Sequence, residues 1–126
     1  MDGFRFDAIN HTIKDKTFRS NPIKGNIFLR PYDKHIHLYD KDQPELHDVL
    51  KSLRGVMDEY PQSFSVGESS GPPEVCARFL GNNLDELHTT INFKMISLPW
   101  SASKFASAVE HWYKALPSGG WPTIVF

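Results

Sequence analysis

The order of local patterns along the chain constrains its fold most, because two strand-like segments followed by a helix occur twice. In the first unit, apolar and polar residues alternate over residues 26–30 and again over 34–39, with a Pro-containing turn between them. Apolar residues then recur at helical spacing over about residues 45–60, which indicates a helix with one buried stripe. Since a tight turn can join antiparallel strands, this unit predicts a β-hairpin followed by a helix.

A second unit of the same order follows. Residues 74–80 alternate like a strand, although the two prolines before them would also suit the start of a helix. We interpret 74–80 as a strand because Gly81-Asn82-Asn83 follows at once, and Gly and Asn accept the backbone angles of a tight turn. Its partner strand is expected over 88–96, followed by a helix over about 102–116.

Together the two units predict an α+β fold with an antiparallel sheet and both helices packed on one sheet face. Short strands are also expected at residues 4–8 and 64–66, and an edge strand at 121–126. The whole chain, residues 1–126, is expected to form a single domain, with 1–23 a poorly defined N-terminal arm or strand.

Composition narrows the class of protein. The apolar fraction of 40% and the charged fraction of 23% are typical of a globular protein. Cys76 is the only cysteine, which excludes an intrachain disulfide and suits a cytoplasmic location. The sequence has no apolar run long enough to suggest a membrane span.

Two histidines are the sharpest candidates for chemistry. On a strand, His35 and His37 would project from one face, where two imidazoles can coordinate a metal ion. The pattern lacks a third ligand, so we expect no metal, no cofactor and no catalytic residues. The chain also has no Gly-x-Ser-x-Gly nucleophile elbow and no phosphate-binding loop.

Acidic residues are concentrated between residues 58 and 86, where the only basic residue is Arg78. Acidic loops on a rigid scaffold suit recognition of a basic protein and speed its association. We therefore predict a partner-binding surface made of five carboxylates and one tryptophan: Asp58, Glu59, Glu68, Asp85, Glu86 and Trp121. The alternative is that these carboxylates only keep the surface solvated. A net charge of −1 disfavours nucleic acid as the partner, and the oligomeric state stays open.

The size of the chain, the order of elements over residues 24–116 and the lack of a catalytic set resemble the small α+β immunity proteins of bacterial toxin systems. The resemblance implies a cytoplasmic inhibitor, not an enzyme, which neutralises a cognate toxin by binding its basic domain directly. Two alternatives stay open. One is a small metal-dependent enzyme that uses His35 and His37, and the other is an adaptor or phage-type interaction protein.

Overall fold

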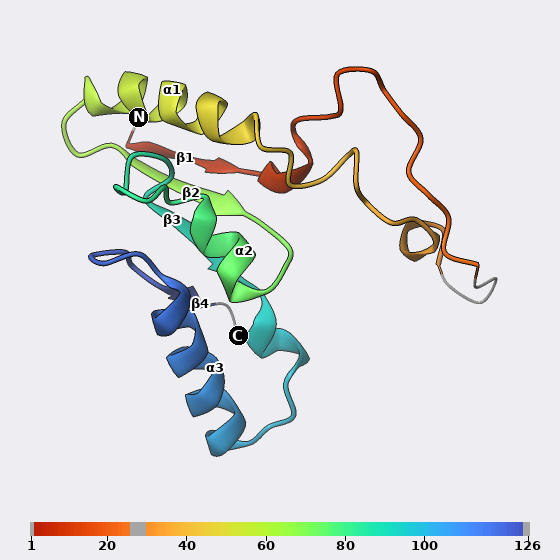
Figure 1. Ribbon diagram of the computed structural model, residues 1–126. Coiled ribbons are helices and arrows are strands. Elements are labelled where there is room, and N and C mark those ends of the chain that lie inside the picture. The colour runs from red at the N-terminus through yellow and green to blue at the C-terminus, as the bar shows by residue number, and fades with distance from the viewer. Residues whose placement is uncertain (1, 26–29, 125–126) are drawn as a thin grey trace.

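The centre of the molecule is a four-stranded sheet in which every neighbouring pair of strands runs parallel (Figure 1). The computed structural model describes residues 2–25 and 30–124. The strands lie in sequence order: β1 (Gly3–Phe6), β2 (Phe64–Glu68), β3 (Thr89–Asn92) and β4 (Thr123–Ile124). The expected antiparallel sheet is therefore wrong.

Each connection between strands contains one α-helix: α1 (Leu46–Asp58), α2 (Pro73–Arg78) and α3 (Ala102–Ala115). Short 3-10 turns occur at η1 (Ile9–His11), η2 (Tyr32–Lys34) and η3 (Lys94–Ser97). Parallel neighbours cannot be joined by a hairpin and need a long crossover, usually helical. Alternation of strands and helices makes this an α/β fold rather than an α+β fold.

The first predicted hairpin does not form among the described residues. Residues 26–29 lie outside the described part of the chain, and residues 32–34 form the turn η2. The described part of 34–39 contains one isolated antiparallel bridge, between Ile23 and His35, and no strand. The sheet face that was expected to display His35 and His37 is consequently absent.

The second predicted hairpin is also wrong, because residues 73–78 form the helix α2. Proline is tolerated in the first turn of a helix, where its missing N–H would have no partner anyway. Residues 89–92 do form the strand β3, but the chain then turns into η3 instead of continuing to residue 96. The helices expected near 45–60 and 102–116 are confirmed as α1 and α3.

Among the described residues, the buried side chains of the helices α1, α2 and α3 form two separate clusters. In the first, Leu46 and Leu50 of α1 pack with three residues from outside that helix: Ile9, Phe79 and Leu87. In the second, Trp112 of α3 packs against Cys76 and Ala77 of α2. The stripes of α1 and α3 thus bury against different neighbours, and the expectation that both helices cover one sheet face stays a prediction.

Register and direction together determine which side chains meet at the end of the sheet. β1 pairs with β2 so that Phe6 lies beside Gly67, and β2 pairs with β3 so that Glu68 lies beside Ile91. Because the strands are parallel, their carboxyl ends lie at the same edge, to the right in Figure 1. The single-domain organisation of residues 1–126 stays a prediction, and β1 lies within the stretch expected to be an arm.

Candidate active site

Two carboxyl groups meet at the carboxyl ends of β1 and β2. The pairing of Phe6 with Gly67 brings the next residue of each segment, Asp7 and Glu68, beside one another. Their side chains are joined by a hydrogen bond. Two acids in direct contact disfavour each other's ionisation, so ionisation of one raises the pKa of the other.

Arg5 contacts both acids from β1. Its Nη1 lies 3.1 Å from Oδ1 of Asp7, and its Nη2 donates a hydrogen bond to Oε2 of Glu68. The backbone N–H of Ala8 also donates to the carboxyl group of Glu68. Ala8 has a φ of 42°, in the left-handed region that a residue with a Cβ seldom adopts. Such strain persists where the surroundings over-determine it, and it is common at functional sites.

The pKa values of the two carboxyl groups are shifted in opposite directions. The hydrogen bond with Glu68, helped by the charge of Arg5, lowers the pKa of Asp7. The hydrogen bond with Asp7, helped by partial desolvation, raises the pKa of Glu68. Asp7 is therefore the more acidic partner and Glu68 the less acidic one. A pair of acids whose environments push their pKa values apart can divide the roles of nucleophile and general acid.

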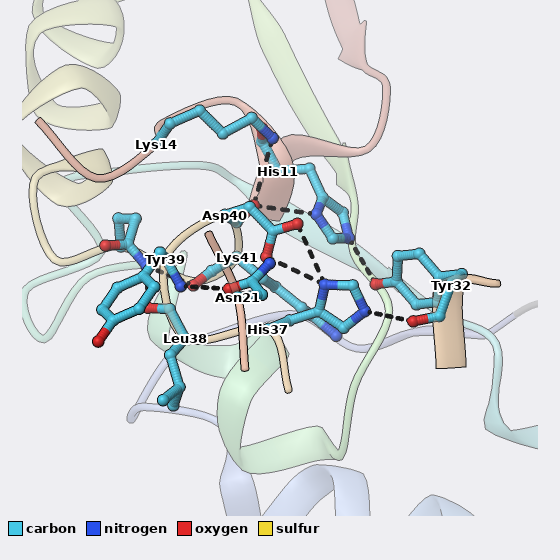
Figure 2. A network of polar contacts seen from close by, with 10 residues as sticks. His11, Lys14, Asn21, Tyr32, His37, Leu38, Tyr39, Asp40 and Lys41 are labelled. Carbon is cyan, nitrogen blue, oxygen red and sulfur yellow. Dashed lines mark hydrogen bonds and ion pairs between the residues drawn. The ribbon is translucent and has the colours of Figure 1, made fainter. Parts of the chain in front are cut away.

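A network of polar side chains organises the long connection between β1 and α1 (Figure 2). Nδ1 of His11 lies 3.1 Å from the carbonyl oxygen of Asp40, and Nε2 of His11 lies 3.1 Å from the hydroxyl group of Tyr32. The ring of His37 stacks on Tyr32 with centroids 3.9 Å apart, and its Nδ1 lies 3.0 Å from the carboxylate of Asp40. His11 follows Asp7 by four positions in the sequence, so this network starts from the loop after β1.

The predicted partner-binding residues do not form one surface. Glu68 lies at the carboxyl end of the sheet, whereas Asp85 and Glu86 precede β3 and lie at its opposite end. Glu86 is only 3% exposed and lies 2.8 Å from Nδ1 of His47, while Asp85 lies 3.7 Å from Nζ of Lys51. The chain thus pairs these two acids with basic residues of its own helix α1.

The remaining three residues of that prediction lie near the end of α1 or before β4. Asp58 accepts a hydrogen bond of 2.8 Å from Arg54, and Glu59 is an exposed residue at the end of α1. Trp121 is 76% exposed. Binding of a basic protein by these residues stays a prediction.

The candidate metal ligands are engaged in other contacts. His37 uses both ring nitrogens, one toward Asp40 and one toward the carbonyl oxygen of Tyr32. In residues 2–25 and 30–124, no group of three His, Cys, Asp or Glu side chains could hold a metal ion. The proposed enzyme based on His35 and His37 has no structural support. None of the helices in these ranges combines the length and apolar character that a membrane crossing requires.

Residues 1–124 match the protein family described as alpha amylase, catalytic domain. The chain belongs to the alpha-amylase catalytic domain family. Its parallel strands and intervening helices correspond to part of the barrel-like domain of that family, whose active sites lie at the carboxyl ends of the strands. The Asp7–Glu68 pair lies at that end.

Curated relatives of this alpha-amylase family chain are alpha-glucosidases. A probable alpha-glucosidase of Rhizobium meliloti (strain 1021) is 30% identical over 94% of this chain and 24% of its own length. An alpha-glucosidase of Apis mellifera is 26% identical over 99% of this chain and 22% of its own length. The chain thus spans about a quarter of the length of the relatives that it matches.

Solved structures agree with this assignment. The alpha-glucosyl transfer enzyme XgtA is 32% identical and superposes with a TM-score of 0.81 over 98% of this chain and 24% of its own. A trehalose-6-phosphate hydrolase of Bacillus licheniformis has the same fold, with a TM-score of 0.69 and 23% identity over 96% of this chain and 22% of its own. The expected identity as an immunity protein that inhibits a toxin, and not an enzyme, is therefore wrong.

Our sequence analysis missed Arg5 and Asp7 and gave Glu68 a different role. A signal was present, because Asp7 lies within the alternating segment Phe4 to Ala8, and Glu68 follows the short segment Phe64 to Val66 by two residues. Two acids at strand ends become a candidate site only if the strands are parallel neighbours. The assumed antiparallel hairpins concealed that arrangement.

Proposed function

We propose that the protein carrying this chain is a retaining hydrolase of α-glucosides, in which Asp7 is the nucleophile and Glu68 is the general acid and base. The observation that carries the proposal is the Asp7–Glu68 hydrogen bond at the carboxyl ends of adjacent strands, bridged by Arg5. The alpha-glucosidase names of the curated relatives support α-glucosides as the substrate class.

The closeness of the two carboxyl groups favours retention of configuration at the anomeric carbon. Inverting enzymes separate their two carboxyl groups by roughly 6.5–9.5 Å to admit a water molecule, whereas retaining enzymes hold them at roughly 5–5.5 Å. Asp7 and Glu68 are in hydrogen-bond contact, which leaves no gap for that water. A covalent intermediate on Asp7 follows from this geometry.

In the first half-reaction, Glu68 donates its proton to the glycosidic oxygen while a carboxylate oxygen of Asp7 attacks the anomeric carbon. The bond between that carbon and the glycosidic oxygen breaks, the alcohol leaves, and the glucosyl group is esterified to Asp7. The raised pKa of Glu68 favours its proton-donating form, and the lowered pKa of Asp7 favours the ionised nucleophile.

In the second half-reaction, Glu68 is a carboxylate and removes a proton from water, whose oxygen attacks the anomeric carbon. The ester bond breaks, so that Asp7 returns as a carboxylate, Glu68 returns as an acid, and glucose is released. Arg5 has a positioning role in both steps, because it contacts both side chains and its charge stabilises the ionised form of each.

The test uses the intact protein with an aryl α-glucoside as substrate, comparing Asp7→Asn and Glu68→Gln with the wild type. Asp7→Asn should abolish formation of the ester, and Glu68→Gln should slow substrates with poor leaving groups more than those with good ones. Asp48→Asn and Glu110→Gln, exposed residues of α1 and α3, are matched controls and should keep wild-type rates. NMR should show α-glucose as the first product. Full activity in Asp7→Asn, or β-glucose as the first product, would contradict the proposal.

Transfer of the glucosyl group to another sugar is a second candidate outcome of the same intermediate. It is favoured by the 32% identity to XgtA, an alpha-glucosyl transfer enzyme. A sugar hydroxyl would replace water in the second half-reaction, with its proton passing to Glu68. Product analysis at high acceptor concentration distinguishes the two, since transfer yields disaccharides and hydrolysis yields free glucose.

We also propose a cytoplasmic location, because Cys76 is a buried free thiol and the only cysteine of the chain. Fractionation of the producing cells tests this, and recovery of the protein outside the cytoplasm would refute it.

A further inference from the structure

A buried amide lies between the two loops that carry the carboxyl pair. Asn10 belongs to the turn η1, three residues after Asp7, and its side chain is among the most completely buried of the described residues, with 1% exposed. A polar side chain buried to this degree is costly unless hydrogen bonds satisfy it. Its partners therefore indicate why an amide stands at this position.

Asn10 bonds to two other segments. Its Nδ2 donates a hydrogen bond of 3.2 Å to the carbonyl oxygen of Ser70, two residues after Glu68. The backbone carbonyl oxygen of Asn10 accepts a hydrogen bond of 2.8 Å from the backbone N–H of Asp42. The side chain of Asn10 also forms a hydrogen bond with the carboxyl group of Asp42. One residue thus connects the loop after β1, the loop after β2 and the segment that leads into α1.

We propose that Asn10 is a positioning residue for the catalytic pair, which fixes the separation of Asp7 and Glu68 by tying the loop after β1 to the loop after β2. This inference rests on the proposed function and deepens it. Asn10 does not touch the carboxyl groups itself. It acts through the backbone of Ser70, so the loop after Glu68 cannot move away from the loop after Asp7.

The separation of the two acids controls how they share a proton. The charged groups that shift Glu68 among the described residues are Asp7 and Arg5, both from the β1 side, together with the backbone N–H of Ala8. If the loops separate, Glu68 loses the hydrogen bond that raises its pKa, and Asp7 loses the one that lowers its pKa. Both values then move toward those of ordinary carboxyl groups.

The test measures kcat, KM and the pH–rate profile of Asn10→Ala and Asn10→Asp in the intact protein, with an aryl α-glucoside. Asn10→Asp keeps the volume of the side chain, but its carboxylate cannot donate to Ser70. We expect kcat to fall by about 10–100-fold with a much smaller change in KM, since misplacement by about 1 Å can cost that much. The alkaline limb of the pH–rate profile, set by Glu68, should move to lower pH, and the acid limb, set by Asp7, should move to higher pH. The pH range of activity therefore becomes narrower.

Asn21→Ala is the matched control. Asn21 lies in the same connection between β1 and α1, accepts a 2.9 Å hydrogen bond from the backbone of Tyr39 and bonds the carboxyl group of Asp40, much as Asn10 bonds Asp42. Its loss should lower stability without shifting the two pH limits of activity, because its hydrogen bonds within the described residues go to Tyr39 and Asp40 and not to the loop after Glu68.

Each remaining outcome decides the question. If the folded Asn10 variants keep the pH–rate profile of the wild type, the proposal is overturned even if kcat falls, because a purely structural role predicts that result. Failure of both variants to fold would also overturn it by making Asn10 a residue of stability alone. Failure of the proposed function gives a different result from failure of this inference. In that case the wild type would show no Asp7-dependent activity on α-glucosides.

Discussion

Gly67→Ala is the sharpest test of how β2 presents Glu68. A Cβ at Gly67 would lie 2.5 Å from Cδ1 of Leu87, whereas carbon atoms in ordinary contact are about 3.5–4.0 Å apart. Cγ2 of Ile9 would lie 3.3 Å away on another side, so the methyl group cannot turn aside. Leu87 is 2% exposed within the first core cluster and has little room to yield. We expect overpacking to lower the free energy of unfolding by about 1–3 kcal/mol.

A double-mutant cycle shows whether the contact with Leu87 causes that loss. Leu87→Val removes Cδ1 and should by itself cost about 0.5–1.5 kcal/mol for the deleted methylene. In Gly67→Ala/Leu87→Val the new methyl group would occupy the vacated space, so the two losses should add up to more than the loss in the double variant. We expect a favourable interaction energy of about 0.5–3 kcal/mol. Urea unfolding of the intact protein, followed by circular dichroism and fluorescence, measures all four free energies.

Gly55→Ala is the control for glycine replacement as such. Gly55 lies in α1, is exposed, and a Cβ there would meet nothing within 4 Å. Alanine stabilises a helix interior relative to glycine, so this variant should gain up to about 1 kcal/mol. The reasoning is refuted if Gly67→Ala is as stable as the wild type, or if its loss adds fully to that of Leu87→Val.

Two further predictions concern the carboxyl pair and the core. Arg5→Gln removes a positive charge that lowers the pKa of both Asp7 and Glu68, so the acid and alkaline limits of activity should both move to higher pH. Steady-state rates measured across the pH range test this. Unchanged limits would show that the charge of Arg5 does not affect the two pKa values. Leu50 is 1% exposed, so Leu50→Ala should lower the free energy of unfolding by about 2–5 kcal/mol. Val49 is 38% exposed, and Val49→Ala should lower that free energy far less. Equal losses in the two variants would contradict the buried stripe of α1.

The errors of the sequence analysis have physical causes that differ between segments. Residues 73–78 are too short for periodicity to separate a helix from a strand, and the alternation of Val75, Ala77 and Phe79 suited a strand as well as the preceding prolines suited a helix. At residues 34–39 alternation was present, but among residues 2–25 and 30–124 the only β-bridge to this segment joins Ile23 and His35. The described part of that segment is ordered by side-chain contacts, including those of His37 with Tyr32 and Asp40.

The sequence by itself determined the helices α1 and α3, and it indicated short strands at residues 4–8 and 64–66, where the structure has β1 (Gly3–Phe6) and β2 (Phe64–Glu68). These elements can be read locally because spacing and alternation are properties of neighbouring residues. Only the tertiary structure decided that the strands are parallel, that Phe6 lies beside Gly67, and that Asp7 consequently meets Glu68. Strand direction and register depend on packing between segments that are far apart in the chain. The alternation in each segment indicates a strand, but neither segment by itself indicates that the two acids meet.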